Sequence, residues 1–256
     1  MILLFAVNTA ILIYLLAPIV VVVATAFGPT AYPVFPPTGL TTKWFARFLS
    51  SPDLVRSTEL SALLSLTSTL CATTIGTLAA LALVRCRFRG KAAASALLLS
   101  PILFPTVVLG LAVLVAFTRV GLAHTFPGLV AAHTVLVLPF VIRLAMASLA
   151  AFDLSIEEAA RNVGAGRLRT FFLVTLPIIR PGLLAGALFG FIVSFDELVI
   201  TLFLAGPGWQ TLPIRIFSSI EYSSDPTISA ISTCLIAIWI VIGVPVYMRF
   251  LTVRRA

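Results

Sequence analysis

Residues 157–164 read Glu157-Glu158-Ala159-Ala160-Arg161-Asn162-Val163-Gly164, and after a polar turn the chain continues with Val174-Thr175-Leu176-Pro177. This short charged segment lies between two long apolar runs. Almost all of the surrounding sequence is suited to a lipid bilayer. A water-facing segment here is therefore expected to contact another part of the protein or a partner. The nature of that contact decides which kind of membrane protein the sequence describes.

The composition of the chain indicates a membrane protein. Of its 256 residues, 60% are hydrophobic and 10% are charged, and the mean hydropathy is +1.15. A soluble domain carries about 25% charged residues. Several apolar runs exceed the roughly 20 residues that a helix needs to cross a ~30 Å hydrocarbon core. The sequence therefore predicts an all-α, polytopic membrane protein with a single domain over residues 1–256.

Six membrane spans are predicted, with a short amphipathic helix after the first. The pattern at 42–49 puts Trp44, Phe45, Phe48 and Leu49 on one face, which favours a helix lying in the lipid headgroup region. The first apolar run is expected to be a membrane span that is retained and not a cleaved signal peptide, because no basic segment precedes it and no cleavage site follows it. The predicted spans are residues 3–26, 60–84, 94–117, 129–150, 178–204 and 228–250.

Basic residues predict the orientation of these spans. They gather in the 85–91 loop, in the 151–180 segment and in the tail, at Arg249, Arg254 and Arg255. Cytoplasmic loops are enriched in lysine and arginine. With six spans, both termini are expected in the cytoplasm, and the net charge of +8 reflects these loops. The sequence has no basic face with stacking aromatics, so it does not indicate a nucleic-acid surface.

Prolines lie inside two of the predicted spans. Pro101 and Pro105 fall in the third span and Pro139 in the fourth. A proline removes one backbone hydrogen bond and bends a helix, so kinks are expected at these three positions. A deformable third span is compatible with gating, and kinks that serve packing alone are the alternative.

The histidines and cysteines do not indicate a metal site or a catalytic centre. Cys71, Cys86 and Cys234 lack the spacing of metal ligands, and His124 and His133 have no partner nearby in sequence. No catalytic residue, metal ion or cofactor is therefore expected on this chain.

The segment 155–164 is predicted to form a short cytoplasmic helix. Ser155 and Glu158 fit a capping box, Glu157 and Arg161 are spaced for an ion pair on the outer side, and Gly164 is a suitable stop. About nine residues are too few for a stable isolated helix. An apolar face formed by Ile156, Ala159, Ala160 and Val163 could dock under the helix bundle of this chain or in a groove of a partner.

Asp196 and Glu197 are acidic residues within the predicted fifth span. At ~1.5 Å per residue, Asp196 is about 24 Å from Arg180, in the outer third of the membrane. Carboxylates at such depth face water or a partner. We expect one of them to line a pathway, next to Phe195, while the other holds a neighbouring helix or subunit. The alternative is that both reach outward to the interface.

The charged segment also resembles a known family. Glu158-Ala159-Ala160, then Gly164, then Val174-x-Leu176-Pro177 is similar to the EAA signature of binding-protein-dependent ABC importer permeases, with valine where isoleucine is commoner. The resemblance implies a bacterial inner-membrane protein whose 155–164 helix is a coupling helix in the groove of an ATPase subunit. Glu158 would contact the ATPase, Ala159 and Ala160 would permit close packing, and Gly164 would make the turn. No P-loop occurs here, so ATP and Mg²⁺ would be used by a separate chain.

A second resemblance concerns the solute. Residues 194–200, 206–207, 211–218 and 225–233 are similar to the second permease chain of spermidine/putrescine-type importers. This implies a small cationic solute such as a polyamine, a second permease subunit, two ATPase subunits and an extracytoplasmic binding protein received by loops 28–58 and 205–226. Permeases for other small solutes remain an alternative. An ion-coupled secondary transporter or a channel would leave the 158–164 helix without a role.

Overall fold

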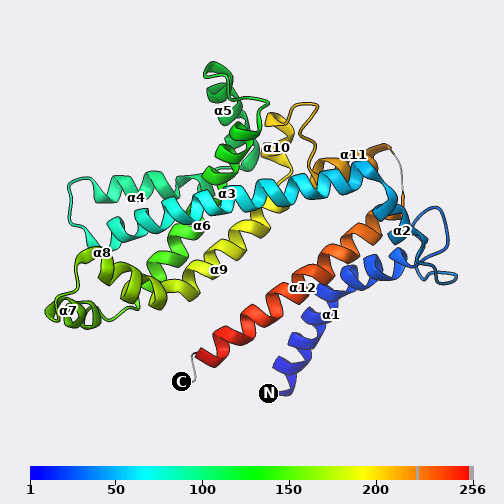
Figure 1. The fold of residues 1–256 in the computed structure, drawn as a ribbon. Coiled ribbons are helices and arrows are strands. Elements are labelled where there is room, and N and C mark those ends of the chain that lie inside the picture. The colour runs from blue at the N-terminus through cyan, green and yellow to red at the C-terminus, as the bar shows by residue number, and fades with distance from the viewer. Residues whose placement is uncertain (223–224, 254–256) are drawn as a thin grey trace. The chain divides into compact units, whose positions relative to one another are not determined.

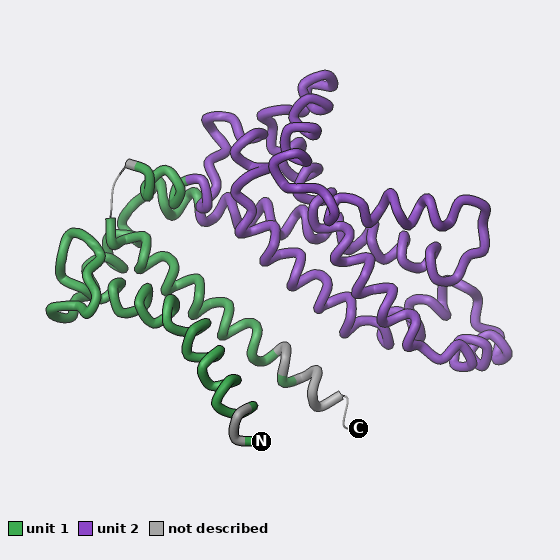
Figure 2. Tube along the Cα trace, turned by 180° about the vertical axis from the view of Figure 1, so that it is seen from behind, with its two compact units in different colours: residues 1–57, 215–256 green, residues 58–214 purple. Residues whose placement is uncertain are grey.

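The computed structural model describes residues 1–222 and 225–253, and every regular element in these ranges is helical (Figure 1). The chain forms two compact units, residues 1–57 with 215–256 and residues 58–214 (Figure 2). Five helices in the described ranges are long and apolar enough to cross a membrane, or six if one bent pair is a single span. This confirms the all-α, polytopic prediction.

Most ends of the long helices lie within three residues of the predicted span ends. α3 begins eight residues before the predicted second span, which extends it well beyond the apolar run. The long helices are α1 (Ile2–Ala26), α3 (Pro52–Arg85), α6 (Phe126–Ala150), α9 (Leu176–Phe195) and α12 (Thr227–Val253).

In the first unit, α1 and the short helix α2 (Lys43–Ser50) both pack against α12. Trp44 is 6% exposed and packs with Ala26 and Ala230, and its Nε1 donates to the carbonyl of Gly28 at 2.8 Å. Trp44 therefore faces protein, whereas the position of the 42–49 helix in the headgroup region stays a prediction. The indole is buried because its single polar atom finds a backbone acceptor there.

Two helices near the C-terminal end begin beside a polar residue and a proline. Helix α11 (Leu212–Tyr222) begins directly after Thr211, with Pro213 in its first turn. Asp225 precedes α12, and its Oδ1 accepts from the backbone N–H of Thr227 at 2.9 Å. A carboxylate at this place satisfies a backbone donor that has no partner within the helix.

In the second unit, α6 packs along α9 through a stripe of small residues. A Cβ atom at Gly190 would lie 2.4 Å from Cγ1 of Val137, and one at Gly182 would overlap the hydroxyl of Ser148. Glycines at this spacing let two membrane helices approach until their backbones nearly touch. The α6–α9 pair is therefore the closely packed centre of this unit.

The predicted third span is wrong as a single helix. The structure has α4 (Lys91–Leu99), a 3₁₀ turn η1 (Ser100–Leu103) and α5 (Thr106–Arg119), and the two arms are bent by 112°. Phe104 and Pro105 between them are extended, with ψ of 141° and 133°. The ring of Pro105 disfavours a helical conformation at Phe104. Pro101 lies in the first turn of η1, whereas α6 continues through Pro139 without a break.

The predicted fifth span is displaced in the structure. It begins with α8 (Arg167–Thr170) and a π-helical turn η2 (Phe171–Thr175), and α9 then ends at Phe195. A separate helix α10 (Val199–Leu204) follows. Asp196 and Glu197 therefore lie at a helix break, and the prediction that they are part of a continuous span is wrong. At the break, Glu197 Oε1 accepts from the N–H of Ile200 at 2.9 Å and so satisfies a backbone donor in the first turn of α10.

Candidate functional site

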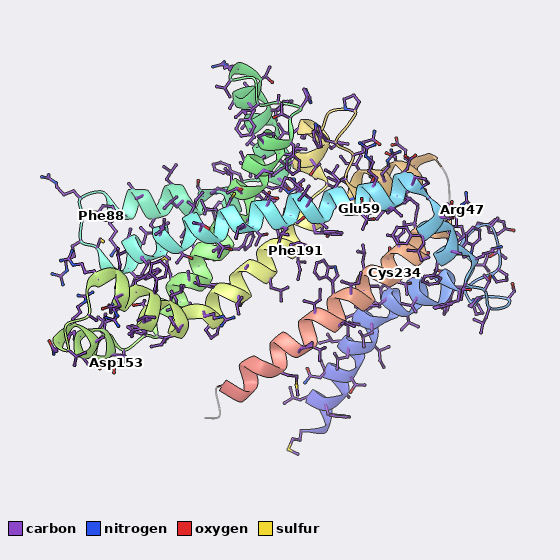
Figure 3. The ribbon with its side chains drawn as sticks, viewed as in Figure 1. Arg47, Glu59, Phe88, Asp153, Phe191 and Cys234 are labelled. Atoms are coloured by element: carbon purple, nitrogen blue, oxygen red, sulfur yellow. The ribbon has the colours of Figure 1, made fainter. Side chains whose placement is uncertain are left out.

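The charged segment forms helix α7 (Leu154–Asn162), one residue earlier than predicted. The N-cap is Asp153, whose Oδ1 accepts from the N–H of Ser155 at 2.9 Å, and the predicted capping box with Ser155 as N-cap is wrong. Figure 3 shows Asp153 at the entry to this helix. Hydrogen bonds from Ser155 hold the pKa of the Asp153 carboxyl below its ordinary value. An ionised acid also interacts favourably with the positive end of the helix.

The helix ends where the sequence predicts. Gly164 has φ of +91°, its N–H donates to the carbonyl of Arg161 at 2.9 Å, and Ala165 donates to Ala160 at 3.1 Å. This left-handed conformation is disfavoured for residues with a Cβ. Gly164 therefore terminates α7 and turns the chain toward α8.

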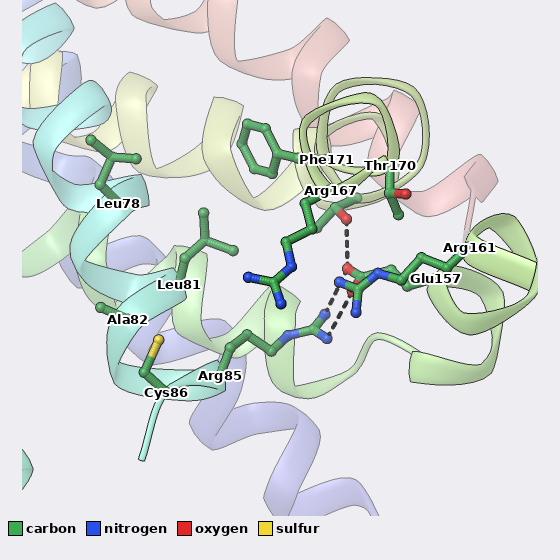
Figure 4. A pocket seen from close by; sticks show the side chains of 11 residues that line it. Leu78, Leu81, Ala82, Arg85, Cys86, Glu157, Arg161, Arg167, Thr170 and Phe171 are labelled. Atoms are coloured by element: carbon green, nitrogen blue, oxygen red, sulfur yellow. Dashed lines mark hydrogen bonds and ion pairs between the residues drawn. The ribbon is translucent and has the colours of Figure 1, made fainter. Parts of the chain in front are cut away.

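Glu157 lies on the inner side of α7, contrary to the prediction that it is on the outer side. The residue is 8% exposed. Its Oε2 and Oε1 accept from the two terminal nitrogens of Arg85, at 3.2 and 3.1 Å (Figure 4). The hydroxyl of Thr175 donates to Oε1 at 2.5 Å. The predicted Glu157–Arg161 ion pair does form, at a longer 3.7 Å.

These contacts join α7 to two membrane helices. Arg85 is the last residue of α3, and Thr175 is the last residue of the π-helical turn that leads into α9. The Arg85 guanidinium also lies 5.1 Å from the Phe152 ring centre. Removing one partner of a buried ion pair costs about 3–5 kcal/mol. We call Arg85, Glu157 and Thr175 the Glu157 clamp.

The predicted apolar face of α7 is open. Ile156 and Val163 are 44% and 86% exposed, and Leu154 is 51% exposed. Glu158 and Ala159 are exposed as well, while Ala160 is half-buried. The chain thus docks α7 through Glu157 and leaves the apolar side uncovered, so the alternative in which this face packs under the chain's own bundle does not hold.

A polar cluster forms at the break between α9 and α10. His133 of α6 is fully buried, with Nδ1 at 2.8 Å from Ser194 Oγ and Nε2 at 2.9 Å from Thr201 Oγ1. Thr201 donates its one hydroxyl proton to the carbonyl of Glu197 at 2.9 Å. Thr201 must therefore accept from Nε2–H, and Nδ1 accepts from Ser194. His133 has no partner nearby in sequence, as predicted, because its two partners are 61 and 68 residues away.

The three residues predicted to line a pathway have different surroundings. Phe195 is 7% exposed and its ring stacks on Phe191 at 6.0 Å. Glu197 is half-buried and caps α10, while Asp196 is exposed. The two acidic residues therefore differ. The Glu197 carboxylate accepts from the backbone of α10, whereas the Asp196 carboxylate is exposed. In the described ranges, no group of three or more His, Cys, Asp or Glu residues could hold a metal ion.

Sequence reasoning missed several of these residues. Arg85 was visible only as part of a basic loop, and Thr175, Ser194 and Thr201 were small polar residues in apolar runs. Each has a partner far away in sequence, such as the 72 residues between Arg85 and Glu157. No local pattern indicates such a pair.

Comparison with known proteins gives the chain its family. Residues 72–252 match the family of binding-protein-dependent transport system inner membrane components. This range contains α7, the Glu157 clamp and the helix break. The chain belongs to this family. It is a multi-pass inner-membrane protein and a permease subunit of an ABC importer, not an enzyme.

Curated relatives support the assignment over nearly the whole permease. It is 32% identical over 233 residues to the spermidine/putrescine transport system permease protein PotC of Escherichia coli, covering 91% of this chain and 88% of the relative. It is 33% identical over 250 residues to the putrescine transport system permease protein PotI of the same organism, covering 95% and 88%. The molybdenum transport system permease protein ModB of Escherichia coli is 33% identical over 172 residues, covering 61% and 75%.

Solved structures show the same fold. A bacterial ABC transporter that imports the acidic polysaccharide alginate matches with a TM-score of 0.74 at 19% identity, over 96% of each chain. An amino acid ABC transporter structure with histidines matches with a TM-score of 0.59 at 19% identity, over 85% of this permease and 100% of that chain. At this identity the likeness concerns the fold alone.

Proposed function

We propose that this permease imports a small cationic solute of the polyamine class. The observation that carries the proposal is the 32–33% identity to PotC and PotI over more than nine tenths of the chain. The carboxylates Asp196 and Glu197 at the helix break support it, because acidic groups inside a membrane protein attract cations. Asp196 is the exposed member of the pair and is the better candidate for solute contact.

We further propose that α7 transmits the movement of a separate ATPase. In this proposal the uncovered apolar side of α7 enters a groove of the ATPase, with Ala159 and Ala160 allowing close approach and Glu158 making a polar contact. The clamp at Glu157 supports the idea, because it ties the same helix to α3 and to the start of α9. ATP and Mg²⁺ are bound by the ATPase.

The remaining partners follow the same proposal. The two compact units act as one permease domain, which pairs with a second permease subunit and two ATPase subunits. The ends of α3 and α8 near α7 face the cytoplasm, as do both termini, and loops 28–58 and 205–226 receive an extracytoplasmic binding protein. Residues 223–224 and the basic tail residues Arg254 and Arg255 lie outside the described residues.

Uptake by the reconstituted importer tests the solute. Proteoliposomes that contain the complete complex and enclosed ATP should accumulate labelled spermidine in the presence of the binding protein. They should not accumulate molybdate, which is the anionic probe suggested by the weaker similarity to ModB. Uptake of molybdate without spermidine would assign the permease to another solute, and spermidine uptake without ATP or the ATPase would disprove coupled import.

A paired substitution tests the acidic residues. Asp196→Asn should lower spermidine uptake, because it removes the exposed charge. Glu197→Gln keeps an oxygen that can accept from Ile200, so a smaller effect is expected. Unchanged uptake in the double variant would remove the proposed role of both residues.

A further inference from the structure

A cleft of about 360 Å³ opens beside the Glu157 clamp, between the end of α3, α7 and the α8–η2 turn (Figure 4). All residues that line the cleft belong to the second unit. The cleft combines a basic group of side chains with an apolar wall. It is lined by Leu78, Leu81, Ala82, Arg85, Cys86, Glu157, Arg161, Arg167, Thr170, Phe171 and Thr175.

The lining carries an excess of positive charge. Arg85, Arg161 and Arg167 bring three guanidinium groups, whereas Glu157 is the single carboxylate. Arg85 and Arg161 both interact with Glu157. The Arg167 guanidinium forms no hydrogen bond or ion pair with any residue in the ranges 1–222 and 225–253. One carboxylate is thus shared by two arginines, and the third has no anionic partner, which favours an anionic ligand.

The other side of the cleft is apolar. Leu78, Leu81 and Ala82 lie along α3, and Phe171 begins the π-helical turn. Leu78 is 62% exposed, so this wall continues outward onto the surface of α3. A small hydrophilic anion would gain nothing from such a wall, whereas an amphiphile would contact both parts of the cleft.

The cleft also lies where the polarity of two helices changes. α3 carries no charged residue between Glu59 and Arg85, its last residue, and Arg87 and Arg89 follow in the loop. The fifth span begins with Arg167 and Arg169 and becomes apolar at Phe171. Both changes occur at the cleft, as expected for the boundary between headgroups and hydrocarbon. Basic pockets between membrane helices at this level suit phospholipid headgroups.

We propose that this cleft binds an anionic phospholipid, with its phosphate at Arg167 and Arg85 and an acyl chain along Leu78 and Phe171. The lipid would lie directly against the Glu157 clamp and would stabilise the attachment of α7. The proposal requires a membrane protein but does not depend on the identity of the transported solute.

Lipid binding to the purified full-length chain tests this. The chain in uncharged detergent is titrated with phosphatidylglycerol or with phosphatidylcholine, and bound lipid is counted by native mass spectrometry. Phosphatidylglycerol should be retained in preference to phosphatidylcholine. Arg167→Ala should weaken its binding about five-fold, the effect of one basic residue near an anionic headgroup, and Arg167→Lys should keep most of it.

Arg169 provides a matched control, because it lies on the same short helix α8 but does not line the cleft. Arg169→Ala should leave retention unchanged, and an equal loss in both variants would show general charge attraction and overturn the proposal. Leu78→Gln should weaken phospholipid retention, and no change would disprove the apolar contact.

Two further outcomes would contradict a lipid site. If inorganic phosphate displaced the lipid at millimolar concentration, the cleft would be a site for a free anion. If Arg167→Ala kept normal lipid retention but lost binding of the ATPase subunit, the cleft would belong to the protein interface.

Discussion

Glu157 of α7 is held by Arg85 at the end of α3 through two N–O contacts of 3.2 and 3.1 Å. The two side chains are 11% and 21% exposed, so water screens their attraction only weakly. This pair joins the short helix α7 to a helix of membrane-spanning length.

Breaking this pair should loosen α7. Glu157→Ala leaves Arg85 without its partner, and the free energy of unfolding should fall by about 3 kcal/mol. ATP hydrolysis in the assembled importer should then continue with little solute uptake. Unfolding in detergent and the ratio of uptake to hydrolysis measure the two effects.

The exposed partner Arg161 is the control for the clamp. Its contact with Glu157 is 3.7 Å long and its side chain is 51% exposed, so Arg161→Ala should cost no more than about 1 kcal/mol. The charge exchange Arg85→Glu with Glu157→Arg should recover part of the lost coupling. If it behaved as the sum of the two single variants, a direct role of the pair would be disproved.

Glu158 should matter for coupling and not for folding, because it is exposed on α7. Glu158→Lys is expected to abolish ATP-driven uptake, while Glu158→Gln should have a milder effect. Both variants should insert normally and keep the wild-type unfolding temperature. Normal uptake by the lysine variant would remove Glu158 from the proposed ATPase contact.

Alanine variants of Gly164 and Gly166 test whether the backbone conformation at Gly164 requires glycine. A Cβ at either position meets open space, so packing does not distinguish the two sites. Only Gly164 has positive φ, so Gly164→Ala should lower stability by about 1 kcal/mol. Gly166→Ala should have no such cost. Hydrogen exchange at the end of α7 would detect the difference, and equal exchange in the two variants would contradict it.

Close packing of α6 and α9 should make Gly190 intolerant of any side chain. Gly190→Ala places a methyl group 2.4 Å from Val137 Cγ1 and should cost about 1–3 kcal/mol. Val137→Ala in the same chain should recover much of this loss, since it removes the clashing atom. Gly243→Ala on α12, where a Cβ meets nothing within 4 Å, is the control. Thermal unfolding in detergent ranks the variants.

His133 should hold the helix break together. His133→Leu leaves the hydroxyls of Ser194 and Thr201 without this partner, and each unsatisfied buried group costs about 1–3 kcal/mol. The expected result is lower stability and faster hydrogen exchange in α10. Adding Ser194→Ala to His133→Leu should cost less than Ser194→Ala alone, and strict additivity would argue against the hydrogen bond.

The amino-acid sequence by itself determined the class of the protein and the features that depend on neighbouring residues. Apolar runs predict the long helices, Gly164 predicts the end of α7, and the pattern of Glu158-Ala159-Ala160 with Gly164 predicts the family. These signals are local, because span length, backbone conformation and motif spacing depend on residues close together in the chain.

Only the tertiary structure decided which side chains meet. The helical pattern predicts which side of α7 carries Glu157. It does not predict that this side faces inward, because the partner Arg85 is 72 residues earlier in the chain. His133 similarly needs Ser194 and Thr201, which are 61 and 68 residues away. At the break after Phe195, the Glu197 side chain accepts from the backbone N–H of Ile200, a contact that the sequence alone did not indicate. Buried polar groups form hydrogen bonds with residues that are close in space. Since these partners are far apart in the chain, no periodic pattern in the sequence indicates them.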